Sequence, residues 1–239
     1  MSKKTDNKNK YSKVSFCDYI DTYEKEIQSS IGFIGQKHDF FISIKAKILI
    51  SLAKKYFINP KEISILDIGC GIGLIDHCLS PFFKNLYGVD IEEPIIEKAR
   101  AFNPDVKYSN YNGSILPFND NTFEMALAIN VMHHVIPARW EAFTNEMFRI
   151  LKPKGLAVVF EHNPLNLLTR LAVNNCEFDK DAVLLRKKKV ERLFSISGFE
   201  IIDSSFILFF PFKYNLFRKI ENAINWLPLG AQYYLIGKK

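Results

Sequence analysis

Hydrophobic and polar positions change their spacing along this chain of 239 residues, and the changes mark out its elements. From Ile63 onward, short continuous apolar runs alternate with segments that carry an apolar residue at every third or fourth position. Short apolar runs predict buried strands, and the longer spacing predicts amphipathic helices. Because the two alternate regularly, the chain is expected to form an α/β domain with a mostly parallel sheet and helices on both faces.

The same pattern places the individual elements. Strands are predicted at residues 65–66, 86–89, 123–129, 156–160, 201–210 and 231–236. Helices are predicted within 15–58 and at 139–151, 165–173 and 182–196, with a helical insertion at 211–228 before the last strand. A turn is predicted at 152–155, where proline and glycine interrupt the pattern. The apolar face of the helix before the first strand is predicted to hold Phe41, Ile44, Ile48, Leu52 and Tyr56, and Asn59-Pro60 is expected to end that helix.

Length and pattern together indicate one domain at residues 14–239, preceded by a basic tail at 1–13 that is too polar to fold. Within the domain, residues 14–58 are N-terminal helices, 63–162 the core that carries the ligand site, and 163–239 the substrate-side helices and a closing hairpin. The N-terminal helices either cover the ligand as a lid or simply pack on the sheet, and the sequence leaves both open.

Composition and charge exclude several classes of protein. The chain has 48% hydrophobic and 24% charged residues, as soluble globular proteins do. The net charge of +6 comes largely from lysine runs at the ends and at 186–189, and without an aromatic-lined basic stripe no nucleic-acid partner is expected. No apolar run is long enough for a membrane span, and the opening residues 1–13 lack the apolar stretch of a signal peptide. Four cysteines without C-x-x-C spacing predict no metal site and no disulfide framework, and they suit a reducing cytoplasm.

The most informative segment is Asp67-Ile68-Gly69-Cys70-Gly71-Ile72-Gly73, where an apolar run ends and three glycines follow at alternate positions. Such a backbone turns sharply and lets a ligand approach unshielded N–H groups. Dinucleotide-binding loops follow G-x-G-x-x-G, but the third slot here is Leu74. The spacing therefore disfavours an NAD-linked oxidoreductase.

A second apolar run ends on Asp90, whose carboxylate offers two acceptor oxygens for the paired hydroxyls of a ribose. The alternative is that Asp90 caps the helix that begins at Glu93-Pro94. Its position after the glycine loop favours the ribose role.

Polar residues follow the ends of five successive apolar runs. They are Asp67, Asp90, Ser114, Asn130 and Glu161. Ligands of open α/β sheets bind outside the carboxyl ends of the strands, so these five are expected to surround one site.

These segments, together with Gly113-Ser114-Ile115-Leu116-Pro117-Phe118 and Asn130-Val131-Met132-His133-His134-Val135, resemble the class I S-adenosylmethionine-dependent methyltransferases, in particular bacterial small-molecule enzymes. The resemblance implies a Rossmann-like seven-stranded sheet with an antiparallel last strand and S-adenosylmethionine as cofactor, released as S-adenosylhomocysteine. The family's acidic adenine contact is replaced by Ser114, and Asn112 competes for that role. The cofactor-binding residues implied are Asp67, Gly69, Cys70, Gly71, Gly73, Asp90, Ile91, Ser114, Ile115 and Asn130.

Methyl transfer to a hydroxyl benefits from a general base, and four residues near the strand ends are candidates. They are His133, His134, Glu161 and His162. An imidazole suits this task at neutral pH, whereas a glutamate would need burial to raise its pKa. The alternative is that these side chains cap a helix or bind backbone.

The family resemblance leaves the acceptor open among small molecules, glycans and lipid-linked compounds, and Arg170 is a candidate for holding an anionic group. The segment after the fourth strand is not the N-P-P-Y or D-P-P-Y tetrad of nucleic-acid methyltransferases. A non-catalytic scaffold or sensor that binds the cofactor is the alternative function. Residues 211–228 could cover the substrate pocket, form a homodimer surface or rest on a membrane.

Overall fold

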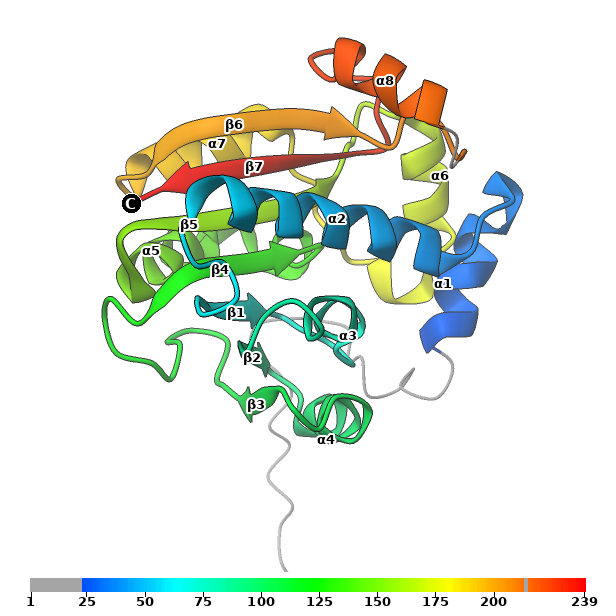
Figure 1. Cartoon of the computed structure of the whole chain (residues 1–239). Helices are drawn as coiled ribbons and strands as arrows, with labels where there is room; N and C mark the ends of the chain where they lie inside the picture. The colour runs from blue at the N-terminus through cyan, green and yellow to red at the C-terminus, as the bar shows by residue number, and fades with distance from the viewer. Residues whose placement is uncertain (1–22, 213–214) are drawn as a thin grey trace, which may run out of the picture.

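A seven-stranded sheet in the order β3-β2-β1-β4-β5-β7-β6 forms the centre of the computed structural model, which describes residues 23–212 and 215–239 (Figure 1). Its strands are β1 (Ser64–Ile68), β2 (Asn85–Asp90), β3 (Lys107–Asn110), β4 (Phe123–Ile129), β5 (Leu151–His162), β6 (Glu200–Ile207) and β7 (Gln232–Lys238). All neighbouring pairs run parallel except those of β7, which is antiparallel to both β5 and β6. This confirms the predicted Rossmann-like sheet with its closing antiparallel hairpin.

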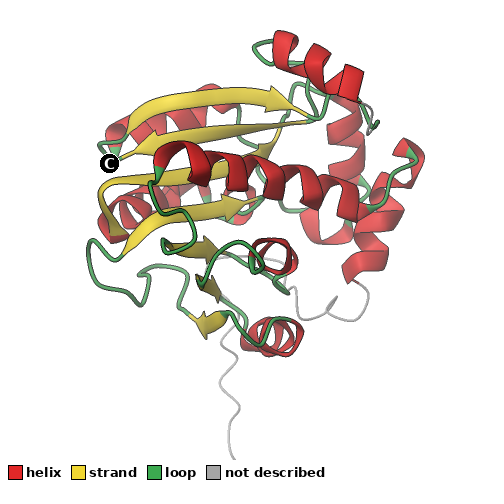
Figure 2. Ribbon diagram, in the orientation of Figure 1, coloured by secondary structure: helices red, strands yellow, loops and turns green. Residues whose placement is uncertain are grey.

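Helices cover both faces of the sheet, as predicted (Figure 2). The α-helices are α1 (Tyr23–Ile31), α2 (His38–Tyr56), α3 (Leu74–Leu79), α4 (Glu93–Phe102), α5 (Trp140–Ile150), α6 (Leu167–Asn174), α7 (Lys187–Ile196) and α8 (Asn215–Ile224). Alternate strand residues face opposite sides, so Ile65 packs with α2, α3 and α4 while Leu66 packs with α5 and α7. The helical N-terminus and the helical insertion before β7 are both confirmed. No helix in the described ranges has the length and hydrophobicity needed to cross a bilayer.

Several predicted boundaries differ from the structure for identifiable reasons. The predicted turn at 152–155 lies inside β5, because Leu151 already pairs with Phe123 and the register then shifts before Met125. Helix α7 begins at Lys187 rather than at residue 182, and β3 was not predicted because its sequence, KYSN, is a polar edge strand. The proposed tail at 1–13 lies outside the described residues.

The apolar face predicted for α2 is rotated. The buried positions are Phe40, Lys45, Ala46, Leu49, Leu52 and Ala53. Tyr56 is exposed, and Phe41 is only half-buried because it lies on a cavity wall. Helix α2 packs on the sheet and lines a cavity at once, and this dual contact explains why a lysine lies on its buried side.

Candidate active site

A cavity of about 350 Å³ opens where the strand order reverses between β1 and β4. One part of its wall is formed by polar residues that follow β1, β2 and β4, and another by largely apolar residues of α1, α2 and α6. A crevice at such a switch point, outside the carboxyl ends of the strands, is where ligands bind in open α/β sheets.

The glycine loop after β1 lies directly on this cavity. Gly69, Gly71 and Gly73 all have left-handed φ values, of 73°, 54° and 79°. A side chain at Gly69 would collide with Val131, and one at Gly73 with Tyr108, whereas a Cβ on Gly71 would meet nothing within 4 Å. The loop therefore packs tightly on its inner side and leaves an open backbone surface at Gly71 for a ligand.

Asp90 organises the neighbouring wall. Its Oδ2 accepts a hydrogen bond from the Gly71 N–H at 3.0 Å, and its Oδ1 accepts one from the Ile91 N–H at 2.7 Å. Helix α4 begins at Glu93 with Glu92 as its N-cap residue, so Asp90 joins two loops rather than capping that helix. Burial raises the pKa of Asp90 to about 6, and the hydrogen bonds from backbone N–H groups limit the rise.

Three buried acceptor atoms on cavity-lining residues have no hydrogen-bond partner among the described residues. They are Asp67 Oδ1, Asn130 Oδ1 and Gln232 Oε1. Asn130 also has a left-handed φ of 57°, a conformation that costs energy for any residue but glycine. Buried acceptors without partners are rare in folded proteins, so these atoms indicate a ligand that brings N–H or O–H donors.

Asp67 and Asp76 are a pair of buried carboxyl groups beneath the loop. Burial and the charges of Asp76 and Asp90 raise the pKa of Asp67 well above its usual range. Burial raises the pKa of Asp76 to about 7, although the hydroxyl of Tyr108 donates to its Oδ2 at 2.8 Å. Ionising both Asp67 and Asp76 is therefore unfavourable in the ligand-free protein.

We expect Asp67→Asn to stabilise the ligand-free protein at pH 8 and to have no such effect near pH 4. The raised pKa means that the folded state binds this proton more tightly than the unfolded chain, so stability falls as pH rises above the unfolded value. Removing the carboxylate removes that loss, and each kcal/mol gained adds roughly 2–4 °C to Tm. Thermal melts across this pH range measure the effect, and an equal gain at both pH values would contradict it.

Not every residue predicted to bind the cofactor lies on the cavity wall. Asp67, Gly69, Cys70, Gly71, Asp90, Ile91 and Asn130 do. Gly73, Ser114 and Ile115 do not: the Ser114 hydroxyl accepts a hydrogen bond from Arg139, and Ile115 points to solvent. Asn112 also faces away, since its Oδ1 accepts from the N–H groups of Ser114 and Ile115. The wall in this region consists of Tyr111, Gly113 and Arg139.

The four predicted catalytic candidates lie together at the end of β4 and β5. His133 Nδ1 lies 2.6 Å from Glu161 Oε2, and both side chains are buried. The other oxygen of Glu161 accepts the Met132 N–H at 2.8 Å. The ring of His162 lies 5.2 Å from that of His133, measured between centroids. His133, His134 and His162 line the cavity, whereas Glu161 lies off the wall and contacts His133.

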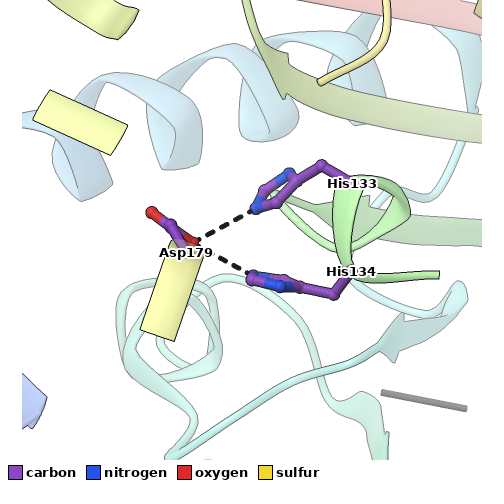
Figure 3. A group of neighbouring side chains, drawn as sticks. All are labelled: His133, His134 and Asp179. Carbon is purple, nitrogen blue, oxygen red and sulfur yellow. Dashed lines mark ion pairs between the residues drawn. The ribbon is translucent and has the colours of Figure 1, made fainter. Parts of the chain in front are cut away.

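Asp179, which the sequence analysis missed as a site residue, completes this group. It belongs to a short 3-10 helix, Glu177–Asp179, on the connection between α6 and α7. Its Oδ1 lies 3.3 Å from His134 Nε2 and 3.6 Å from His133 Nε2 (Figure 3). Two imidazoles from one turn therefore converge on a single carboxylate oxygen.

The charges of this cluster are unevenly distributed. Burial would lower the pKa of His133, but Glu161 and Asp179 raise it to about 10. Burial and the charge of His133 lower the pKa of His134, and they lower that of His162 to about 4. Without further ligands the cavity end thus holds one imidazolium between two carboxylates, next to two neutral imidazoles.

Helices enclose the remaining part of the cavity with apolar side chains. They come from α1, α2 and α6 and from the segments around residues 178 and 208–211: Ile27, Ile31, Phe41, Ile42, Leu168, Ala172, Val173, Phe178, Leu208, Phe209, Phe210 and Pro211. Lys45 is a buried cation on this wall, and burial lowers its pKa to about 8 while Glu161 opposes the shift. Both the position of Lys45 and that of Asp179 depend on tertiary packing.

Comparisons with known proteins agree with this geometry. A family model described as a methyltransferase domain matches residues 66–159. An uncharacterized protein of Methanocaldococcus jannaschii is 34% identical over 162 residues, which are 68% of this chain and 66% of that protein. A ubiquinone biosynthesis O-methyltransferase of Rhizobium etli is 27% identical over 193 residues, covering 73% of this chain and 75% of that enzyme.

Solved structures of methyltransferases share the fold. A Thermotoga maritima structure, described as a S-adenosylmethionine-dependent methyltransferase and possible histamine N-methyltransferase, superposes with a TM-score of 0.67 at 23% identity. The match covers 94% of this chain and 97% of that one. The matched family model spans the glycine loop, Asp90 and the turn that carries His133. This chain belongs to the class I S-adenosylmethionine-dependent methyltransferases.

Proposed function

We propose that this enzyme transfers a methyl group to an oxygen atom of a small, largely apolar acceptor. The observation that carries the proposal is the pairing of an apolar enclosure with one polar end, where His133, His134 and Asp179 meet. An apolar cavity with a few convergent polar groups is typical of small-molecule sites. The Rhizobium relative, named as an O-methyltransferase of ubiquinone biosynthesis, supports oxygen as the methylated atom.

The residues around the glycine loop fit the cofactor implied by the family. Asp90 would hold the ribose hydroxyls, the open backbone at Gly71 would face the methionine part, and the unpartnered oxygens of Asp67 and Asn130 would accept from its ammonium group. Bound there, S-adenosylmethionine supplies a methyl group on a positively charged sulfur.

The protein's own part is to position the acceptor and to ionise it. The walls from α1, α2 and α6 exclude water and align the acceptor, which accounts for much of the rate in a displacement of this kind. The histidine–carboxylate cluster would orient the acceptor hydroxyl and favour the loss of its proton. No finding favours the alternative of a non-catalytic scaffold.

A panel of acceptors that differ only in the reacting atom tests this proposal. Wild-type protein with S-adenosylmethionine carrying a labelled methyl group is incubated with phenols and catechols and with the matching anilines and thiophenols. We expect the label to enter the hydroxyl compounds, with formation of S-adenosylhomocysteine in equal amount. Transfer to the anilines alone, or release of the product without a labelled acceptor, would contradict oxygen as the acceptor atom.

A further inference from the structure

Two imidazole nitrogens and one carboxylate oxygen face a common point on the cavity wall. His133 Nε2, His134 Nε2 and Asp179 Oδ1 all lie within 4.8 Å of one another (Figure 3). The side chains are 1%, 17% and 10% exposed, so solvent screens the interactions between their charges only weakly. The group combines residues from two distant parts of the chain, the turn after β4 and the connection between α6 and α7.

The distances match ligands of one metal ion better than direct hydrogen bonds. The 3.6 Å from His133 Nε2 to Asp179 Oδ1 is too long for a hydrogen bond. Two ligands at about 2.0–2.1 Å from a tetrahedral ion lie roughly 3.3 Å apart, which is close to both of the separations that Asp179 makes. The third separation, between the ligand atoms of the two histidines, is at most 4.8 Å, so binding one ion would draw the two rings together.

The surroundings also have the features of a metal site. A histidine ligand normally donates its second ring N–H to a carboxylate, and His133 Nδ1 lies 2.6 Å from Glu161 Oε2. This contact directs the lone pair of the ring to Nε2, the atom that faces Asp179. Glu161 is itself held by the Met132 N–H, which donates to its other oxygen at 2.8 Å. His133 therefore has a carboxylate partner that orients its ring toward Asp179.

We propose that His133, His134 and Asp179 bind a divalent transition-metal ion of the zinc type, with a coordination position left open toward the cavity. Three protein ligands with one open position are typical of catalytic rather than structural zinc. The sequence predicted no metal site, because the scattered cysteines lack metal-ligand spacing. The proposed site uses histidines and an aspartate instead. It needs only the geometry of this cluster and not the identity of the acceptor.

The ion also explains how the acceptor is recognised, and this second step rests on the proposed function. With the ion in place, His133 and His134 are neutral ligands, and the charges are those of Glu161, Asp179, Lys45 and the ion. Their sum is one positive charge, and the positively charged sulfur of the cofactor would add a second, so an acceptor oxyanion is stabilised here. A hydroxyl bound to the ion would release its proton to solvent and remain as that oxyanion. The ligand class is therefore a phenol or catechol.

Metal binding is tested without any acceptor. Protein dialysed against a chelator is titrated with Co²⁺ or Zn²⁺, and bound metal is measured by elemental analysis and by the visible absorption of four-coordinate Co²⁺. Asp179→Ala removes a ligand, while Asp181→Ala changes an exposed acid two residues further on. We expect one equivalent of metal in the wild type and in Asp181→Ala, and binding at least ~100-fold weaker in Asp179→Ala.

Binding of S-adenosylhomocysteine by each variant shows that it is folded. A second ligand variant, His134→Ala, should lose the Co²⁺ bands in the same way. The proposal is overturned if the wild type binds no metal, or if Asp179→Ala and His134→Ala bind it as tightly as Asp181→Ala does. Methylation of phenols by metal-free enzyme would overturn the metal's role in recognition alone, whereas a metal-loaded enzyme that methylates only anilines would reject the oxygen acceptor and leave the site standing.

Discussion

Asp90→Ala is expected to weaken the binding of S-adenosylhomocysteine by roughly 10- to 150-fold. Hydrogen bonds to a charged group contribute about 1.5–3 kcal/mol, and this carboxylate is the acceptor placed for the ribose hydroxyls. The variant also frees the N–H groups of Gly71 and Ile91, which Asp90 holds at 3.0 and 2.7 Å, so the glycine loop loses a constraint as well. Isothermal titration of wild type and variant at pH 8, where Asp90 is ionised, measures the loss.

Two further variants make this result specific. Glu97→Ala removes an exposed acid from α4, the helix that follows Asp90, and should bind the ligand as the wild type does. Asp90→Asn keeps one acceptor oxygen and should fall between the wild type and Asp90→Ala. If Asp90→Ala is folded and binds with unchanged affinity, the ribose does not lie at Asp90.

The part of the site on the parallel strands could be predicted because parallel strands bring their carboxyl ends to one edge. Asp67, Asp90 and Asn130 end neighbouring strands, and all three line the cavity. His133 and Glu161 also meet for this reason, because β4 and β5 are neighbours in the sheet. In each case the local sequence pattern already determines the end of the strand.

The parts that could not be predicted depend on packing between distant segments. Asp179 lies on a connection without hydrophobic periodicity, and only the course of the chain around α6 brings it to His134. Lys45 lies on the buried side of α2, which is rotated relative to the apolar face that the pattern predicted. Ser114 follows β3, a polar strand with no apolar signal, and its hydroxyl is taken by Arg139 instead of facing the cavity.

Glu161→Gln should separate the support of the cluster from the support of the fold. Glu161 is fully buried and uses both oxygens, one for His133 and one for the Met132 N–H. A glutamine can accept only one of these hydrogen bonds, and it removes the negative charge beside His133. Breaking a buried pair in this way costs about 3 kcal/mol, and a lost carboxylate partner of a site histidine lowers activity by about 100-fold.

Glu124→Gln provides the matched comparison on the adjacent strand. Glu124 also accepts from a backbone N–H, that of Ser64 at 2.8 Å, and it pairs with Lys152, but it lies away from the cavity. Both variants should therefore melt at lower temperature than the wild type, while only Glu161→Gln should lose methyl transfer. Equal turnover in the two variants would mean that Glu161 stabilises the sheet and has no part in orienting His133. Loss in Glu161→Gln alone would show that the histidine cluster acts on the acceptor through the position that this carboxylate gives it.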